Sequence, residues 1–166
     1  MSEKKLTESI EDDRGVLARR DGAGLPARRG TLAHVSAEQI ALADKIFIDG
    51  LEVFANHGVY EEENKLGQKF VVSATLYCDT RRAGQTDDLD ASIDYGAVCH
   101  DIDGFLRDHT FKLVERMAES LAEHLLDGYA QLLGVRLRIE KPWAPVGLPL
   151  RSVGVEIERL RLSAVR

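Results

Sequence analysis

Apolar and polar residues alternate with a period of two in four segments of the chain, and this pattern predicts four β-strands. The first segment covers residues 46–53 and changes parity at Asp49-Gly50, as a strand with a bulge at the glycine would. The second covers residues 70–78. The third and fourth cover residues 135–139 and 153–157.

Between the second and third strands the apolar period becomes that of a helix. An apolar stripe runs through residues 98–106, and either Ser92 or Asp94 is placed to cap that helix. A second helix follows, with apolar residues every four positions over residues 113–125. The order ββααββ predicts an α+β domain, an antiparallel four-stranded sheet with two helices on one face. Its other face carries charged side chains, which are solvated, paired across strands, or directed into a channel.

The composition changes near Ala43. Residues 1–43 hold seven acidic and seven basic side chains and no aromatic residue. So little apolar area cannot offset the entropy lost on ordering, so we expect a disordered and dispensable extension over residues 1–43 and a domain over residues 44–166. The capping-box spacing of Ser36 and Gln39 allows one short helix over residues 36–42.

The overall composition narrows the class of protein. With 166 residues, 44% of them hydrophobic, the chain fits one globular core, and a formal net charge of −6 argues against a general nucleic-acid binder. No apolar run approaches the length of a membrane span, and the charged N-terminus is unlike a secretory signal. Cys78 and Cys99 lack CxxC spacing and favour reduced thiols. We therefore expect a cytoplasmic protein that does not bind nucleic acid or membranes.

Two segments offer groups for proton transfer. Lys141 ends the third strand, and Pro142 stops that strand, so the lysine is held on rigid scaffold. It is either a general acid/base or an ordinary solvated lysine. The loop over residues 57–68 carries three consecutive carboxylates, including Glu63. One of them either orients a substrate hydroxyl and supports a nearby lysine, or all belong to a solvated acidic loop.

Two further candidates sit at predicted helix starts. Tyr95 either projects its phenol from a rigid element or packs in the core. Glu115 either binds a ligand or offsets the positive end of the helix dipole.

Six short motifs, in this order and spacing, resemble the dihydroneopterin aldolase family of folate biosynthesis. The resemblance covers residues 44–159, which is everything except the extension and the last few residues. The motifs are FANHGV (54–59), ENKLGQ (63–68), TDD (86–88) with IDY (93–95), LVE (113–115) ahead of AE (118–119), IEKP (139–142) and SVGVEI (152–157).

The resemblance implies a tunnelling fold, in which ββααββ subunits close into a multi-subunit barrel. Two tetramer rings stack into a homo-octamer, with active sites at the subunit interfaces. It also implies an enzyme, a carbon–carbon lyase that splits 7,8-dihydroneopterin into 6-hydroxymethyl-7,8-dihydropterin and glycolaldehyde.

The family roles fall on six positions of this chain. Lys141 would be the general acid/base, Glu63 its partner, and Tyr95 a further proton-handling residue. Glu115 and the main chain at Val114 would bind the pterin, and Ile93 is also expected to contact the substrate. No cofactor is implied, and the lysine need not form a Schiff base.

A metal site is not expected from the sequence. The histidines include no HxH or HxxxH pair that would build a zinc face, which argues against the zinc-dependent relatives that share the fold. The histidines are His34, His57, His100, His109 and His124.

Two alternatives remain beside the aldolase. An epimerase of dihydroneopterin or its triphosphate would use the same intermediate, but a triphosphate specialist needs more basic residues than the single Arg151 that lies near Lys141 in the sequence. The other alternative is a non-catalytic pterin-binding ring scaffold. Such a scaffold would not need the side chains of Glu63, Tyr95, Glu115 and Lys141.

Overall fold

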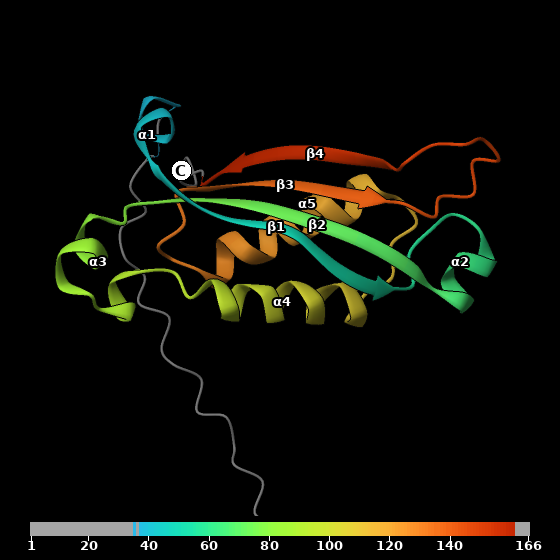
Figure 1. The fold of residues 1–166 in the computed structure, drawn as a ribbon, viewed down its shortest axis with the longest axis horizontal. Coiled ribbons are helices and arrows are strands. Elements are labelled where there is room, and N and C mark those ends of the chain that lie inside the picture. The colour runs from blue at the N-terminus through green and yellow to red at the C-terminus, as the bar shows by residue number, and fades with distance from the viewer. Residues whose placement is uncertain (1–34, 36, 162–166) are drawn as a thin grey trace, which may run out of the picture. The chain divides into compact units, whose positions relative to one another are not determined.

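The computed structural model describes residues 35 and 37–161, and over this range the predicted ββααββ order and α+β class are confirmed. Four strands form one antiparallel sheet in the order β1-β2-β3-β4, and two long helices cover one of its faces (Figure 1). The strands are β1 (Asp44–Ala55), β2 (Gln68–Cys78), β3 (Gly134–Lys141) and β4 (Val153–Leu160), and the long helices are α4 (Tyr95–Asp108) and α5 (Val114–Gly128).

The bulge predicted in the first strand lies where the parity of the sequence changes. The register between β1 and β2 shifts between Ile48 and Leu51. Gly50 lies inside the shift with φ of 71°, a backbone conformation that favours glycine, and its N–H donates to Ser73 Oγ at 3.0 Å. The bulge lets both halves of β1 keep apolar side chains on the face toward the helices.

The core lies between this face of the sheet and the helices. Alternate residues of β2 and β3 point into it, and the apolar stripes of α4 and α5 meet them, as the two sequence periods predicted. The fully buried side chains include Phe70, Val72, Leu76, Val135, Leu137, Ile139, Val98, Ile102, Leu106, Met117, Leu121 and Leu125.

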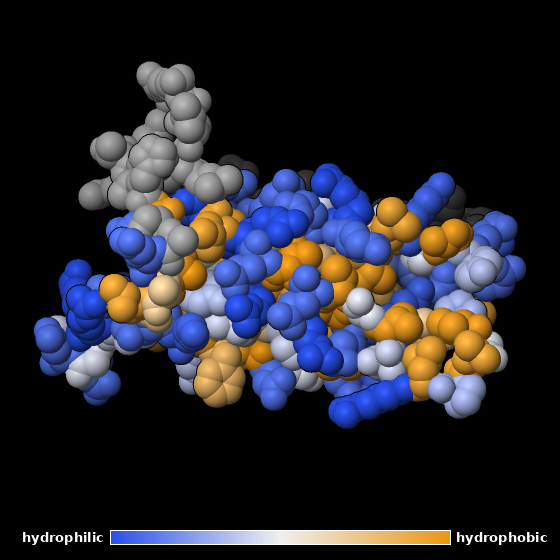
Figure 2. Space-filling model, turned by 90° about the horizontal axis from the view of Figure 1, so that it is seen from above, coloured by the Kyte–Doolittle hydropathy of each residue, from blue (hydrophilic) through white to orange (hydrophobic). Residues whose placement is uncertain are grey.

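The opposite face of the sheet is largely polar, and part of its charge is paired across strands. Arg136 lies opposite Glu158 in the register of β3 and β4, and the two side chains form an ion pair of 2.8 Å. The Tyr77 hydroxyl donates to the same carboxylate at 2.7 Å. Figure 2 shows hydrophilic side chains spread over this face, with apolar ones between them. The edge strands of the sheet are β1 and β4.

Both long helices begin where the sequence indicated. Of the two candidate caps for α4, Asp94 is the one that serves, since its side chain accepts hydrogen bonds from the N–H groups of Gly96 (2.8 Å) and Ala97 (3.1 Å). Helix α5 follows Leu113 directly. These two starts fix where the first turns of the helices, and the side chains on them, lie relative to the sheet.

The two connections predicted to be irregular contain short helices instead. Helix α2 (Glu61–Leu66) lies in the first, and α3 (Arg81–Thr86) with a 3₁₀ turn (Leu89–Ala91) lies in the second. None of the three buries a residue, so none leaves an apolar period in the sequence. The acidic first turn of α2 is favoured by the helix dipole, which explains why carboxylates form a helix there.

Two predictions made from the composition concern the cysteines, expected to be reduced thiols, and the lack of a membrane-spanning segment. Cys78 is buried and Cys99 half-buried, and neither forms a disulfide. Within the described part of the chain, no helix combines the length and the apolar character needed to cross a bilayer.

The predicted extension over residues 1–43 lies mostly outside the described residues. Helix α1 (Ala37–Leu42) falls where the capping-box spacing allowed a helix. Ile40 in this helix is buried, and its Cδ1 would lie 3.3 Å from a Cβ placed on Gly134. Ile40 therefore packs against the start of β3.

This contact predicts a measurable cost for removing α1. A chain beginning at Asp44 should fold as one beginning at Val35 does, but its free energy of unfolding should be lower by about 1.5–3 kcal/mol, the value of burying one isoleucine side chain. Urea unfolding of the two chains at equal concentration measures the difference. Equal stability would mean that Ile40 contributes nothing to the fold.

Candidate active site

The most buried ion pair among the described residues joins Lys141 to Glu63. Lys141 is the last residue of β3, and its Nζ donates to Glu63 Oε1 of helix α2. Only 10% of the lysine side chain and 9% of the glutamate side chain are exposed. The interpretation of these residues as a solvated lysine and a solvated acidic loop is therefore wrong.

Three donors hold the Glu63 carboxylate. Besides Lys141, the Gln68 side chain donates to Oε1 at 3.0 Å, and the Tyr60 N–H donates to Oε2 at 3.0 Å. Burial alone would raise the pKa of Glu63, but the hydrogen bonds from Lys141, Gln68 and Tyr60 outweigh it and lower the pKa below its usual value. Glu63 therefore stays ionised and holds the Lys141 amine in one place.

Gln68 is a functional residue whose role the sequence did not reveal. It is buried at the start of β2, and its Nε2 also donates to the His57 carbonyl at 3.1 Å. The amide thus fixes Glu63 relative to the end of β1. The motif ENKLGQ contains both residues, but only the structure shows that the turn at Gly67 brings them together.

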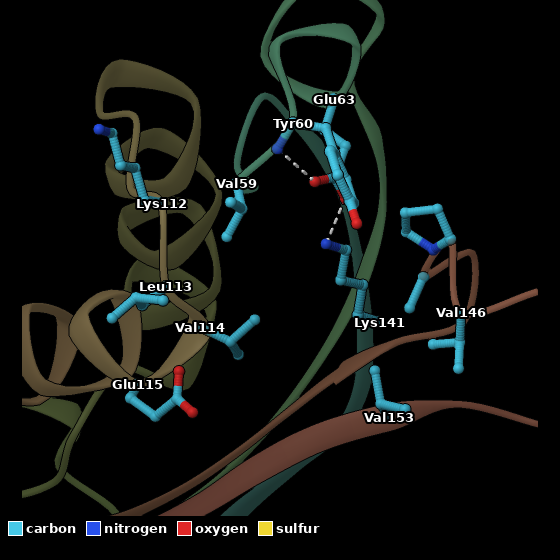
Figure 3. A pocket seen from close by; sticks show the side chains of 12 residues that line it. Val59, Tyr60, Glu63, Lys112, Leu113, Val114, Glu115, Lys141, Val146 and Val153 are labelled. Carbon is cyan, nitrogen blue, oxygen red and sulfur yellow. Dashed lines mark hydrogen bonds and ion pairs between the residues drawn. The ribbon is translucent and has the colours of Figure 1, made fainter.

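A pocket of about 520 Å³ opens beside this pair, a volume suited to a small-molecule ligand. Four segments line it (Figure 3). They are the segment from Val59 to Glu63 at the start of α2, the segment from Lys112 to Glu115 at the start of α5, the β3–β4 connection from Lys141 to Val146, and Val153 at the start of β4. Most of its wall is apolar, and the Lys141–Glu63 pair is separated from the other charged lining residues, Lys112 and Glu115. Lys112 was not predicted as a pocket residue.

The first turn of α5 supplies the second polar wall. Glu115 lines the pocket, and its side chain makes no hydrogen bond or ion pair within residues 37–161, so the carboxylate is available to a ligand. Figure 3 shows it across the pocket from Lys141. The N–H of Val114 belongs to the first helical turn and has no intrahelical acceptor. A carboxylate acceptor and a backbone donor without an intrahelical partner therefore lie side by side in the helical turn that lines the pocket.

Tyr95 and Ile93 do not line this pocket. Tyr95 is the first residue of α4 and the residue is 64% exposed, so the interpretation as a buried packing tyrosine is wrong. The Ile93 side chain is buried in the core. Helix α4 is 14 residues long, about 20 Å, and its first turn lies at the end of the sheet away from α2 (Figure 1). Within a single chain, Tyr95 therefore lies outside the pocket that Lys141 lines.

Possible metal ligands are scattered. In the part of the chain that the structure describes, no three His, Cys, Asp or Glu side chains gather where they could hold a metal ion.

The family profile and the curated relatives that this chain matches carry the same description. The sequence profile of the family described as dihydroneopterin aldolase matches residues 46–158. Dihydroneopterin aldolase of Bacillus subtilis is 38% identical over 116 residues, 70% of this chain and 97% of the relative. The enzyme of that name from Methylorubrum extorquens is 36% identical over 124 residues, 75% of this chain and 95% of the relative.

Solved structures give the same family. Escherichia coli dihydroneopterin aldolase, solved in complex with neopterin, is 34% identical and aligns with a TM-score of 0.65 over 70% of this chain and 98% of that one.

Gly58 offers a test of the geometry around Glu63. Its φ is 153°, and a Cβ at this position would lie 2.3 Å from Glu63 Oε2. Gly58→Ala should therefore displace the carboxylate from Lys141, and it should destabilise the chain by about 1–3 kcal/mol through backbone strain alone. The displaced lysine should react faster with an amine-acylating reagent, followed by mass spectrometry.

Gly84→Ala in α3 is the matched control, because no atom lies within 4 Å of its added Cβ. If the two variants matched in stability and in Lys141 labelling, the close packing of Gly58 on Glu63 would have no bearing on the pair.

Proposed function

Because this chain belongs to the dihydroneopterin aldolase family, we propose that it cleaves 7,8-dihydroneopterin into 6-hydroxymethyl-7,8-dihydropterin and glycolaldehyde in folate biosynthesis. The observation that carries the proposal is the buried Lys141–Glu63 pair on one wall of a pocket whose other wall presents the unpaired Glu115 carboxylate. The neopterin bound to the E. coli relative supports a pterin as the ligand. The proposed location is the cytoplasm.

The chemistry asks for a proton-transfer group rather than a covalent catalyst. Retro-aldol cleavage removes a proton from a hydroxyl and needs a sink for the electrons of the broken carbon–carbon bond. Dihydroneopterin carries that sink, since its C6=N5 imine adjoins the breaking bond. Lys141 then exchanges protons directly or through water, a contribution of about 10²–10⁴-fold in rate. Glu63 keeps its amine in position and accepts from the side-chain hydroxyls.

The start of α5 suits the pterin ring. A pterin presents a ring N–H beside an amino group, and one carboxylate can accept both hydrogen bonds in parallel. Glu115 has that acceptor pair, and the Val114 N–H can donate to a ring heteroatom. In this arrangement the ring lies against the apolar wall, and its side chain reaches toward Lys141.

We propose that the active enzyme is a homo-octamer of two stacked tetramer rings, with each site shared between neighbours. The edge strands β1 and β4 support it, because pairing them between copies would close the sheet into a barrel. Exposed apolar residues such as Phe47 and Leu148 offer contact area. Tyr95, remote from its own pocket, would reach a neighbour's pocket and protonate the enamine carbon. Ile93, whose side chain is buried, would contact the substrate through its main chain.

Epimerisation is the second candidate, as a side activity of the same site. Re-addition of glycolaldehyde to the enamine from the other face gives the epimer. Lys112 on the pocket wall adds a basic group that a phosphorylated substrate would need. Separate detection of glycolaldehyde and dihydromonapterin distinguishes the two activities, and a non-catalytic scaffold would form neither product.

Glu115 gives a direct test of the pterin anchor. Its replacement in Glu115→Ala removes two charge-assisted hydrogen bonds of about 1.5–3 kcal/mol each. Affinity for 6-hydroxymethyl-7,8-dihydropterin, measured by calorimetry, should therefore fall about 10²–10⁴-fold. Glu123→Ala, an exposed glutamate on the same helix, is the control and should bind normally. An affinity of Glu115→Ala within about threefold of wild type would place the anchor elsewhere.

Shared sites predict complementation between two defective variants. Lys141→Ala and Tyr95→Phe should each release glycolaldehyde slowly. Chains of the two variants, unfolded together and refolded as a mixture, should recover about a quarter of wild-type activity, because one site in four then pairs an intact Lys141 with an intact Tyr95 of a neighbour. Activity of the mixture equal to the mean of the two variants would show that no site is shared in this way.

A further inference from the structure

Two hydrogen bonds at Phe111 join the loop that leads to Glu63 to the segment that leads to Glu115. The N–H of Gly58 donates to the Phe111 carbonyl at 3.0 Å. The N–H of Phe111 donates to Nδ1 of His57 at 3.1 Å. Both backbone polar groups of Phe111 are therefore satisfied by consecutive residues of the other segment.

Packing alone does not account for a histidine at position 57. The ring is 2% exposed, meets Phe70 edge-on with centroids 5.2 Å apart, and stacks on Phe111 at 5.6 Å. Since Nδ1 accepts a hydrogen bond, the neutral ring carries its proton on Nε2. That buried nitrogen makes no hydrogen bond of good geometry among the described residues, although the Leu106 carbonyl is close enough to favour the protonated ring. A phenylalanine would fill the same space without this cost. What only the histidine supplies is the acceptor for Phe111.

We propose that His57 is a positioning residue, which fixes the distance between the Lys141–Glu63 pair and the pterin anchor at Val114 and Glu115. The proposal rests on the function proposed above. His57 lies on a short chain of bonds between the two groups. Gln68 ties the Glu63 carboxylate to the His57 carbonyl, and the imidazole ties His57 to Phe111, three residues before Val114.

The protonation state of His57 keeps this link intact at neutral pH. Burial lowers the pKa of His57 to about 4, a smaller effect of the Leu106 carbonyl opposes the shift, and the charges of His109 and Lys141 add to it. His109 stacks on Phe111 with centroids 5.9 Å apart, and Glu63 is connected to His57 through Gln68. The imidazole is therefore neutral above about pH 5, and Nδ1 remains an acceptor.

Three variants separate positioning from packing. His57→Phe keeps the ring and removes the acceptor. His57→Asn removes the ring and keeps an acceptor near the Nδ1 position. His109→Phe makes the same change of residue type against the other side of Phe111 and leaves the His57 bond untouched. Turnover of 7,8-dihydroneopterin is measured per active site, counted by titration with 6-hydroxymethyl-7,8-dihydropterin, so that a smaller folded fraction does not lower kcat.

We expect kcat per site to fall at least about tenfold in His57→Phe, while the affinity for 6-hydroxymethyl-7,8-dihydropterin stays within about threefold, because each half of the site survives and only their separation is lost. His57→Asn should recover most of kcat despite its smaller side chain, and His109→Phe should match wild type.

The positioning role would be overturned if kcat per site in His57→Phe equalled the wild-type value, or if it were higher than kcat per site in His57→Asn. If His57→Phe does not fold, His57→Gln takes its place, because its acceptor lies one atom further out. A higher kcat per site in His57→Asn than in His57→Gln then supports the proposal, and equal values or the reverse order overturn it. Absence of turnover in the wild-type chain would instead overturn the proposed function.

Discussion

The Lys141–Glu63 ion pair is the interaction on which the rest of the site depends. Two charged side chains with about a tenth of their area exposed are stable only together, and removing one partner of such a buried pair costs about 3–5 kcal/mol. The residues are 78 positions apart in the chain. Antiparallel pairing of β2 with β3 brings them together, because Gln68 begins one strand beside the site and Lys141 ends the other.

The two halves of the pocket come from different layers of the fold. Lys141 lies at the end of β3 and pairs with Glu63 of α2, and the helical layer supplies Glu115 in the first turn of α5. The layers pack through apolar side chains, which resist compression but carry little directional information. The hydrogen bonds at Phe111 therefore set the orientation of the two halves of the pocket. A buried histidine can accept one of these bonds, which a hydrocarbon side chain cannot do.

The sequence predicted the elements in which apolar residues recur with a regular period. Period-two and helical stripes located the strands and long helices, and parity located the bulge at Gly50. Helices α2 and α3 were missed, because six residues that bury nothing leave no period. The residue pattern marked Lys141, Glu63 and Glu115 as candidates, the family resemblance gave them their expected roles, and the structure brings these three to one pocket. The roles of Gln68 and His57 depend on strand register and loop contacts, and no local pattern records either one.

The most direct test of the account is one turnover of 7,8-dihydroneopterin on excess enzyme, with both products quantified, for wild type and Lys141→Ala. Wild type should release 6-hydroxymethyl-7,8-dihydropterin and glycolaldehyde in equal amounts. Lys141→Ala should bind the pterin almost as tightly but release both products at least about 10²-fold more slowly, the typical contribution of a general acid/base. Cleavage by Lys141→Ala at the wild-type rate would contradict the central claim that the buried lysine moves the proton.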